Sequence, residues 1–207
     1  MKDNIIKLQE ALKKYNLKMW LIVNKDNSDK IFYKYISKHL YTQSFLFVLQ
    51  NRCVLLINDQ DKNNKDVKEL VSIGVKVYVY DSEYKMLDTI EEIICSLDYI
   101  DKIALSYSTL SDKDTDLMLH SDIAKYTGII RNIYKKYHKK VRFCSSEKVI
   151  YHFLSQNHEK RLSRIKLAAK ITDEILDYTM RNIYVNMSEI EIANLVVTNM
   201  KNISNSL

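Results

Sequence analysis

The histidine, aspartate and serine side chains could carry out catalysis or bind metal, but their spacing matches no known motif. The five histidines never form H-x-x-x-H or H-E-x-x-H, which a zinc-binding helix requires. The acidic run over residues 112–116 begins like a calcium loop, but Leu117 and Ile123 stand where an EF-hand needs Gly and Glu. Ser111 as a helix N-cap followed by acids explains that run. With no G-x-S-x-G motif either, we expect no catalytic or metal-ligating residue.

The cysteines and glycines exclude several other kinds of site. Cys53, Cys95 and Cys144 are far apart and lie among apolar residues, which predicts buried thiols in a reducing cytoplasm rather than a disulfide. The two glycines, Gly74 and Gly128, are too distant from each other to form a phosphate-binding loop. The longest apolar runs are five residues, so we expect no membrane span, and the N-terminus has no apolar signal region. We therefore expect a cytoplasmic protein with no membrane partner.

Basic residues are concentrated in one stretch of the chain. Residues 123–146 contain no acid and carry a charge of +7, against +6 for the whole chain. The cations are Lys125, Arg131, Lys135, Lys136, Lys139, Lys140 and Arg142. Tyr134 and Tyr137 lie between them, as in stacking sites for nucleic acid, but a solvated helix end and connector would look the same. We expect only weak, non-specific binding of nucleic acid through Lys135, Lys136, Lys139 and Lys140.

The elements that position these residues alternate along the first three quarters of the chain. Apolar runs predict strands at residues 19–23, 45–49, 53–57, 75–80, 103–107 and 141–144. Helical spacing of apolar residues predicts helices at residues 4–15, 61–72, 82–97 and 112–126. Strands two and three form a hairpin, with Asn51 as a left-handed residue in its loop. The sequence therefore predicts an α/β fold with a mixed sheet flanked by helices.

The chain changes character near residue 148, after which only helical patterns appear. Leu162, Ile165, Ala169, Leu176 and Met180 follow the spacing of one helix face, and Ile192, Val196 and Met200 form another stripe. Ser188 and Glu191 form a capping box, which marks the start of a helix expected to run to about residue 200. Two helices without a sheet do not make a domain. We therefore expect a first domain at residues 1–157 and an incomplete second one at 158–207.

Four stretches resemble the creatinase/prolidase/aminopeptidase P family of pita-bread metallopeptidases. They are residues 19–29, residues 102–110, residues 145–150 leading into 165–174, and residues 187–193. The last, Met187-Ser188-Glu189-Ile190-Glu191-Ile192-Ala193, is similar to the family's Pro-Gly-Met-Thr-Glu-x-Glu-x-Ala, with Val185-Asn186 in place of Pro-Gly. The resemblance implies a creatinase N-terminal-like, ribonuclease H-like domain, followed by the helical start of an incomplete pita-bread α+β domain.

The resemblance also implies what this chain lacks. Family members are metal-dependent peptidases, Xaa-Pro aminopeptidases and dipeptidases, whose two divalent metal ions, typically manganese, are held by two Asp, one His and two Glu. Those ligands lie in the sheet that follows the Ser188 helix, and so would come after Leu207. The resemblance therefore implies no cofactor in this chain and no activity of the chain alone. Its role would be that of a non-catalytic domain for oligomerisation and for covering the active site.

A loop after the first strand is the part that the resemblance places nearest a partner's active site. Asp26, Asn27, Asp29 and Tyr33 are its candidate substrate- or partner-facing residues, although ordinary turn chemistry also accounts for the first three. The expected partner is a second copy or a separate catalytic half, with a peptide substrate only in the full-length context. Two alternatives stay open: a basic module binding nucleic acid or another partner through Lys125 to Arg142, and a non-functional remnant of a split gene.

Overall fold

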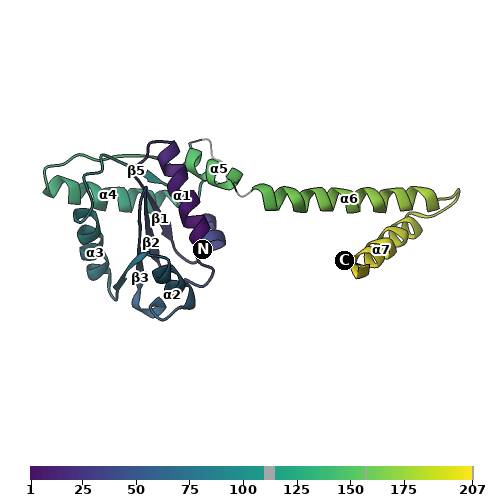
Figure 1. The fold of residues 1–207 in the computed structure, drawn as a ribbon, viewed down its shortest axis with the longest axis horizontal. Helices are drawn as coiled ribbons and strands as arrows, with labels where there is room; N and C mark the ends of the chain where they lie inside the picture. Colours follow the sequence, from purple (N-terminus) through teal and green to yellow (C-terminus); the bar gives the residue numbers. More distant parts are fainter. Residues whose placement is uncertain (110–114, 157, 207) are drawn as a thin grey trace. The chain divides into compact units, whose positions relative to one another are not determined.

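The structure is a computed structural model that describes residues 1–109, 115–156 and 158–206. It divides the chain into two compact units, Met1–Ser155 and Gln156–Leu207 (Figure 1). The first unit holds the whole sheet, and the second consists of two helices. Within the described ranges, every helix is too short or too polar to serve as a membrane span.

The first unit is built on a mixed six-stranded sheet in the order β4-β3-β2-β1-β5-β6. The central strands β1 and β2 are antiparallel, as are β2 and β3, whereas the outer pairs are parallel. The strands are β1 (Met19–Asn24), β2 (Ser44–Leu49), β3 (Cys53–Asn58), β4 (Lys76–Tyr80), β5 (Lys102–Leu105) and β6 (Arg142–Ser145). Each predicted strand is present in this one sheet, so the prediction of a mixed α/β fold is confirmed.

Helices cover both faces of the sheet and enclose two apolar cores (Figure 1). Alternate side chains of β1 enter opposite cores, with Trp20 and Ile22 on one side and Met19 and Leu21 on the other. The first core is closed by α1 (Lys2–Lys14), α2 (Lys65–Ser72), α5 (Glu147–Gln156) and a π-helix, η1 (Phe32–Ile36). The second is closed by α3 (Glu83–Cys95) and α4 (His120–Lys136). All residues of β1 and β2 are buried, as expected for strands covered on both faces.

The boundaries of α4 differ most from the prediction. The helix begins at His120 rather than at residue 112, and it runs to Lys136 rather than to residue 126. Leu117 and Met118 are buried, and the Leu117 N–H donates to the Ser106 carbonyl, so packing holds this segment outside the helix. The predicted N-cap at Ser111 lies outside the described residues.

Two smaller predictions about local structure are also wrong, and one helix was missed. Helix α2 begins at Lys65 because the Asn64 side chain caps the Asp66 N–H, after a short 3-10 turn, η2 (Asp59–Asp61). Asn51 is not left-handed; the hairpin closes instead through the Leu49 N–H to the Arg52 carbonyl. Helix α5 was not predicted, because its ten residues follow a strand directly.

The second unit consists of α6 (His158–Asn182) and α7 (Glu189–Ser206). The predicted capping box is confirmed: the Ser188 N–H donates to Glu191 Oε2 at 2.8 Å, and the Glu191 N–H donates to Ser188 Oγ at 3.3 Å. The helix continues to Ser206, beyond the predicted end near residue 200. Asn186, in the turn before it, has a φ of 74°, in the left-handed region that favours glycine.

Candidate functional site

The loop after β1 turns sharply at two of the four residues that were predicted to face a partner. Asp26 and Asn27 have φ values of 51° and 60°, a conformation that Asn and Asp tolerate better than most residues. The Ser28 N–H donates to the Lys25 carbonyl at 2.9 Å and closes the turn. Asp26 is exposed and Asn27 is half-buried, so the tip of the loop is accessible.

Asp29, the third candidate, lies at the base of this loop and is fully buried. Its Oδ1 accepts the Phe32 N–H at 2.8 Å, and its carbonyl accepts the Tyr33 N–H at 2.9 Å. These bonds start η1, the π-helix that contributes Phe32 and Ile36 to the core. Asp29 therefore positions the loop, and its prediction as an outward-facing residue is corrected because its side chain has no accessible surface.

Burial also makes the Asp29 carboxyl a weaker acid than an ordinary aspartate. Removal from water raises its pKa to about 6. Hydrogen bonds from the Phe32 N–H and the Ser106 hydroxyl favour the charged form and so partly oppose this rise. Ser106 in turn accepts the Trp20 Nε1–H at 3.1 Å. Within the described residues, Asp29 Oδ2 makes no hydrogen bond. The base of the loop is thus a buried polar cluster that joins the ends of β1 and β5.

Tyr33, the fourth candidate, is on η1 and lines a shallow hollow of about 240 Å³ beside α2. Its side chain is 38% exposed, so it can contact another molecule. The same hollow includes Ser37, His39 and Asp66. Asp26, Asn27 and Tyr33 are thus accessible parts of one loop, while the prediction that this loop faces a partner stays a prediction.

Ser37, His39 and Asp66 are the residue types of a catalytic triad, but their hydrogen bonds are not those of a triad. The Ser37 hydroxyl donates to Asp66 Oδ2 at 2.6 Å, and His39 Nδ1 lies 3.0 Å from the same oxygen. Ser37 thus bonds to the carboxylate rather than to the imidazole, which a triad would need as its base. Burial raises the pKa of Asp66, but these hydrogen bonds outweigh it and hold that pKa below its usual value. The group ties the end of the loop to α2.

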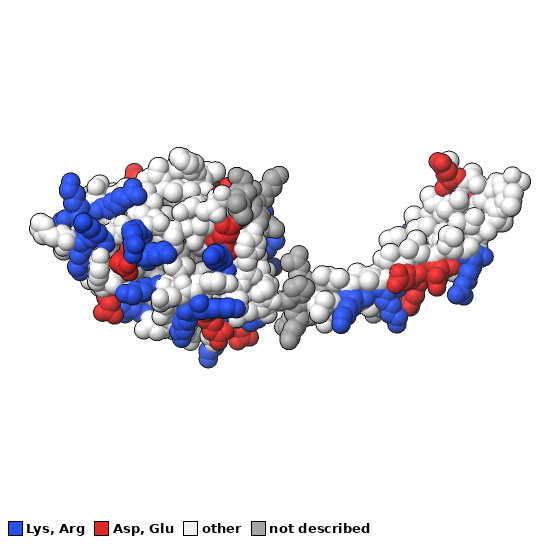
Figure 2. Space-filling model, turned by 90° about the horizontal axis from the view of Figure 1, so that it is seen from above, with Lys and Arg blue, Asp and Glu red and all other residues white. Residues whose placement is uncertain are grey.

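The predicted basic residues lie along α4 and the turn that follows it. Three of the seven cations are neutralised: Lys125 by Glu83, Lys136 by Glu91, and Arg142 by Asp101. Figure 2 likewise shows acidic side chains among the basic ones on the face of the first unit that it presents. For Lys135, Lys139 and Lys140, the described residues provide no ion pair. The sequence could not show this neutralisation, because the acids come from α3 and from the segment before β5.

The unpaired cations surround a shallow groove of about 600 Å³. It is lined by Arg131, Tyr134, Lys135, His138, Lys139, Lys140, Val141 and Arg142, none of which is acidic. Tyr134 is only 6% exposed, so it is not available to stack on a base as the sequence suggested, whereas Tyr137 is 46% exposed. The groove can therefore attract anions but offers few aromatic contacts.

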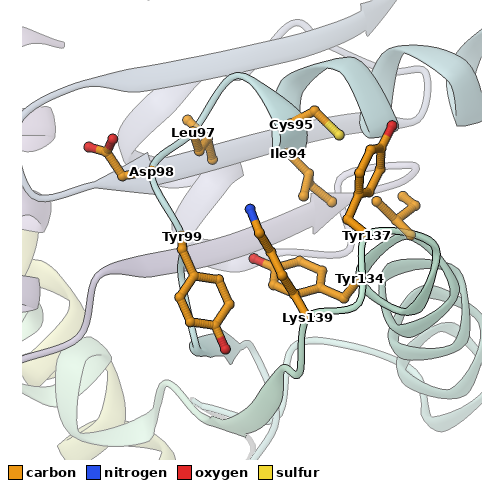
Figure 3. Close-up of a pocket in the computed structure, with 9 residues that line it drawn as sticks. Ile94, Cys95, Leu97, Asp98, Tyr99, Tyr134, Tyr137 and Lys139 are labelled. Atoms are coloured by element: carbon orange, nitrogen blue, oxygen red, sulfur yellow. The ribbon is translucent and has the colours of Figure 1, made fainter.

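A small aromatic pocket of about 130 Å³ adjoins this groove, between the ends of α3 and α4 (Figure 3). Tyr99, Tyr134 and Tyr137 line it, and Lys139 Nζ lies 5.6 Å from the centre of the Tyr99 ring. Lys139 points into the pocket and so occupies part of it (Figure 3). Sequence patterns gave no signal for this pocket, because packing of α3 on α4 brings its residues together.

Cys95, on the rim of the same pocket, is exposed, contrary to the expectation of three buried thiols. It is the last residue of α3 and lies off the buried face formed by Met86, Ile90, Ile93 and Ile94. Cys53 is buried, and Cys144 is half-buried. Burial raises the pKa of Cys53 to about 12, so this thiol stays protonated at neutral pH.

No protein-family model matches the chain, and no curated protein is similar to it in sequence. Solved structures are similar over most of its length. The prolidase from Pyrococcus horikoshii OT3 is 17% identical, with a TM-score of 0.43, over 97% of this chain and 48% of that one. The Xaa-Pro dipeptidase from Bacillus anthracis is 16% identical, with a TM-score of 0.48, over 97% and 48%. The chain therefore spans about half the length of these two proteins.

A third similar structure is a separate domain. It is the creatinase/prolidase N-terminal domain of an X-Pro dipeptidase from Streptococcus pyogenes, 12% identical with a TM-score of 0.43. The similarity covers 69% of this chain and 94% of that domain.

Proposed function

We propose that this chain is the non-catalytic N-terminal part of a cytoplasmic Xaa-Pro peptidase-like metallopeptidase, with an oligomerisation and active-site-covering role. The four segments that resemble the family coincide with successive elements of the structure: β1 and its loop, β5, the passage from β6 through α5 into α6, and the turn before α7. Their order is the one that the resemblance implies. A chain with this role is expected to be inactive alone.

The observation that carries the proposal is the conformation of Asn186. The family motif has Gly where this chain has Asn186, and the residue keeps a φ of 74° that few side chains tolerate. The capping box two residues later also has both of its hydrogen bonds. A left-handed residue therefore stands where the family motif has the residue type that adopts this conformation most readily, which supports a shared local structure rather than a chance similarity of sequence.

The catalytic metals of such an enzyme would be held by another segment or another chain. Among the residues that the structure describes, no three His, Cys, Asp or Glu side chains are grouped so that they could hold a metal ion. The residues present therefore do not fit the family's metal centre, and we derive no hydrolytic step from them. The contribution of this chain would be its loop, with Asp26, Asn27 and Tyr33 toward a peptide bound elsewhere and Asp29 holding the base.

We expect the purified chain to bind no stoichiometric manganese or zinc and to release no proline from Xaa-Pro dipeptides when manganese is added. Elemental analysis and a dipeptide hydrolysis assay measure both. Mixed with a separately expressed catalytic half of an Xaa-Pro dipeptidase, the chain should increase dipeptide hydrolysis. Tyr33→Ala should remove much of that increase, because Tyr33 is the exposed aromatic residue of the loop.

Tyr84→Ala is the matched control, since Tyr84 is 74% exposed on α3, which covers the opposite face of the sheet. A chain that hydrolyses dipeptides alone, or that contains about one metal ion per molecule, would contradict the proposal. If Tyr33→Ala and Tyr84→Ala had equal effects, the loop would have no special part in the proposed role.

The groove beside α4 supports a second candidate function, a module that binds nucleic acid or another polyanion. Its unpaired cations and its lack of acidic lining residues favour anion binding. The neutralised cations around it and the burial of Tyr134 favour weak attraction over specific recognition. This function therefore ranks second.

For this groove we expect weak binding of single-stranded RNA that falls about twentyfold between 50 and 200 mM salt, as for about three phosphate contacts. Fluorescence anisotropy with a labelled oligonucleotide measures it. Lys140→Ala should weaken binding and reduce the salt dependence. Lys136→Gln combined with Glu91→Gln should change little, because it removes both charges of an existing ion pair together. Submicromolar binding at physiological salt would reverse the ranking of the two functions.

A further inference from the structure

Three adjoining hollows lie at one end of the sheet, opposite to the end that carries the loop after β1. The aromatic pocket of about 130 Å³ shares Asp98 and Tyr99 with a shallow hollow of about 650 Å³. It shares Tyr134 and Lys139 with the basic groove of about 600 Å³. Strand pairing places all three at this end, because β1, β5 and β6 begin there and the β2–β3 hairpin turns there. We call the three hollows together the hairpin-end surface.

The hairpin-end surface is strongly basic. Among the residues that line it, Asp98 is the only acid. The lining cations to which the described part of the chain gives no ion pair are Lys13, Lys18, Arg52, Arg131, Lys135, Lys139 and Lys140. The first three lie outside the basic stretch of the sequence, so the fold extends that stretch over a wider surface. A surface with charges of one sign attracts a partner of the opposite sign, here an acidic one.

The aromatic pocket is too small to hold a whole organic ligand. Clefts that bind cofactors or drug-sized molecules measure about 300–1,000 Å³. A cavity of roughly 150 Å³ holds one benzene ring, so a pocket of about 130 Å³ matches one leucine- or phenylalanine-sized side chain. Its lining includes Ile94 and Ile133, which are buried, and Leu97, which is half-buried. The pocket therefore suits one apolar side chain of a longer ligand that continues into the adjoining hollows.

Two of the three tyrosines of this pocket are poorly placed to stack on a nucleobase. Tyr134 is almost fully buried. The Lys136 ammonium group lies 5.7 Å from the centre of the Tyr137 ring, and its ion pair with Glu91 holds it there. The Tyr137 hydroxyl donates to the same carboxylate at 2.9 Å. Stacking would need free ring faces, whereas an apolar side chain needs only the apolar lining, so the pocket favours a peptide over a nucleic acid.

Lys139 is the residue that can open the pocket. Its side chain points into the pocket (Figure 3), and its Nζ lies 5.6 Å from the centre of the Tyr99 ring. Within the described residues it has no ion pair. A ligand carboxylate that draws this ammonium group outward replaces an exposed cation–π contact with an exposed ion pair, and the two interactions are of similar strength. An acidic ligand can therefore empty the pocket with little loss of free energy.

We propose that the hairpin-end surface binds an acidic peptide segment of a partner protein, with one apolar side chain of that segment in the aromatic pocket. Acidic residues next to this anchor pair with Lys139 and with the unpaired cations of the two shallow hollows. The proposal rests on the basic groove of the second candidate function, to which it assigns a partner of defined chemistry. It does not depend on the peptidase-related role of the loop at the opposite end of the sheet.

Fluorescence anisotropy of the full chain with labelled peptides tests this proposal. The probe is a short glutamate-rich peptide with one central leucine, and its control has alanine in place of the leucine. We expect the leucine peptide to bind about tenfold more tightly, because the pocket removes its additional apolar surface from water. Arg52→Gln and Lys140→Gln should each weaken the binding of both peptides about threefold, since each removes one cation from a different shallow hollow. Lys25→Gln is the matched control: it makes the same change of charge at an exposed position just after β1, at the opposite end of the sheet, and should leave both affinities unchanged.

The Cys95 thiol on the rim of the pocket reports whether the peptide enters it. Cys95 is the exposed cysteine, whereas Cys53 is buried and Cys144 is half-buried. At saturation, the leucine peptide should slow the reaction of Cys95 with N-ethylmaleimide at least fivefold, and the alanine peptide should slow it less. Mass spectrometry measures the rate, and the variant Cys95→Ser identifies any reaction of the other two thiols.

Equal affinities for the leucine and alanine peptides, or an unprotected Cys95 at saturation, would overturn the proposal. It would also be overturned if Lys25→Gln weakened binding as much as Arg52→Gln. A uridine oligonucleotide that binds more tightly than the leucine peptide and protects Cys95 equally well would favour nucleic acid and reject the peptide. Far-UV circular dichroism checks that each variant remains folded.

This experiment can fail separately from those for the two proposed functions. The dipeptidase mixing experiment depends on the loop after β1 and not on the hairpin-end surface. Salt-dependent binding of RNA without any preference for the leucine peptide would support the second candidate function and reject this inference.

Discussion

Replacing Phe153 with alanine is expected to lower the free energy of unfolding by about 3–5 kcal/mol, the usual range for deleting a buried aromatic ring. Phe153 has no exposed surface, and its ring packs edge-on against Tyr35 at 4.9 Å between ring centres. It lies in the core formed by α1, η1 and α2, so the substitution leaves a cavity among residues that cannot easily collapse.

Urea unfolding followed by the fluorescence of Trp20, the single tryptophan, measures this change. Trp20 lies in the same core as Phe153. Tyr84→Ala, an aromatic deletion at an exposed helix position, should cost less than about 1 kcal/mol. If Phe153→Ala were equally mild, α5 would not be part of the first unit's core, and the assignment of that helix would be wrong.

Asp29→Asn is expected to stabilise the protein at neutral pH, although it changes one buried atom. The raised pKa of Asp29, about 6, means that between pH 4 and pH 6 the folded state holds a proton that the unfolded state has lost. The free energy of unfolding therefore falls as the pH rises through this window. Asparagine keeps an oxygen for the Phe32 N–H but carries no charge, so the variant should not show this fall.

The measurement is the difference in unfolding free energy between Asp29→Asn and the original chain as a function of pH. We expect this difference to grow in favour of the variant by about 2.5 kcal/mol from pH 4 to pH 7, which corresponds to a shift of about two pKa units. Asp26→Asn is the matched control, since it makes the same change from carboxyl to amide in the same loop, at an exposed position. Asp29→Ala should destabilise at all pH values, since it also removes the acceptor that starts η1. A pH-independent result for Asp29→Asn would show that the buried carboxyl has an ordinary pKa.

The candidate loop shows where sequence reasoning succeeded and where it stopped. The polar residues after the first strand predicted a turn, and Asp26 and Asn27 form it with left-handed backbones. Asp29 differs from Asp26 and Asn27 in being buried. Its burial depends on the ends of β1 and β5, which are about 80 residues apart in the chain. The sequence could not distinguish an exposed aspartate from a buried one three residues later.

The sequence by itself determined the six strands, most of the helices and the start of α7. These features depend on residues close together in the chain: segments of four to six mostly apolar residues, helical spacing, and a capping box of four. Such local preferences act before any tertiary contact exists, and they survived in a chain with two glycines and no proline.

Only the tertiary structure decided the order of the strands, the start of α4, the exposure of Cys95 and which lysines are neutralised. Each of these depends on a residue distant in sequence: Ser106 holds the segment before α4, and Glu91 on α3 pairs with Lys136. Burial and ion pairing depend on which residues the fold brings within a few ångströms of each other. These distances cannot be derived from the order of residues in one sequence.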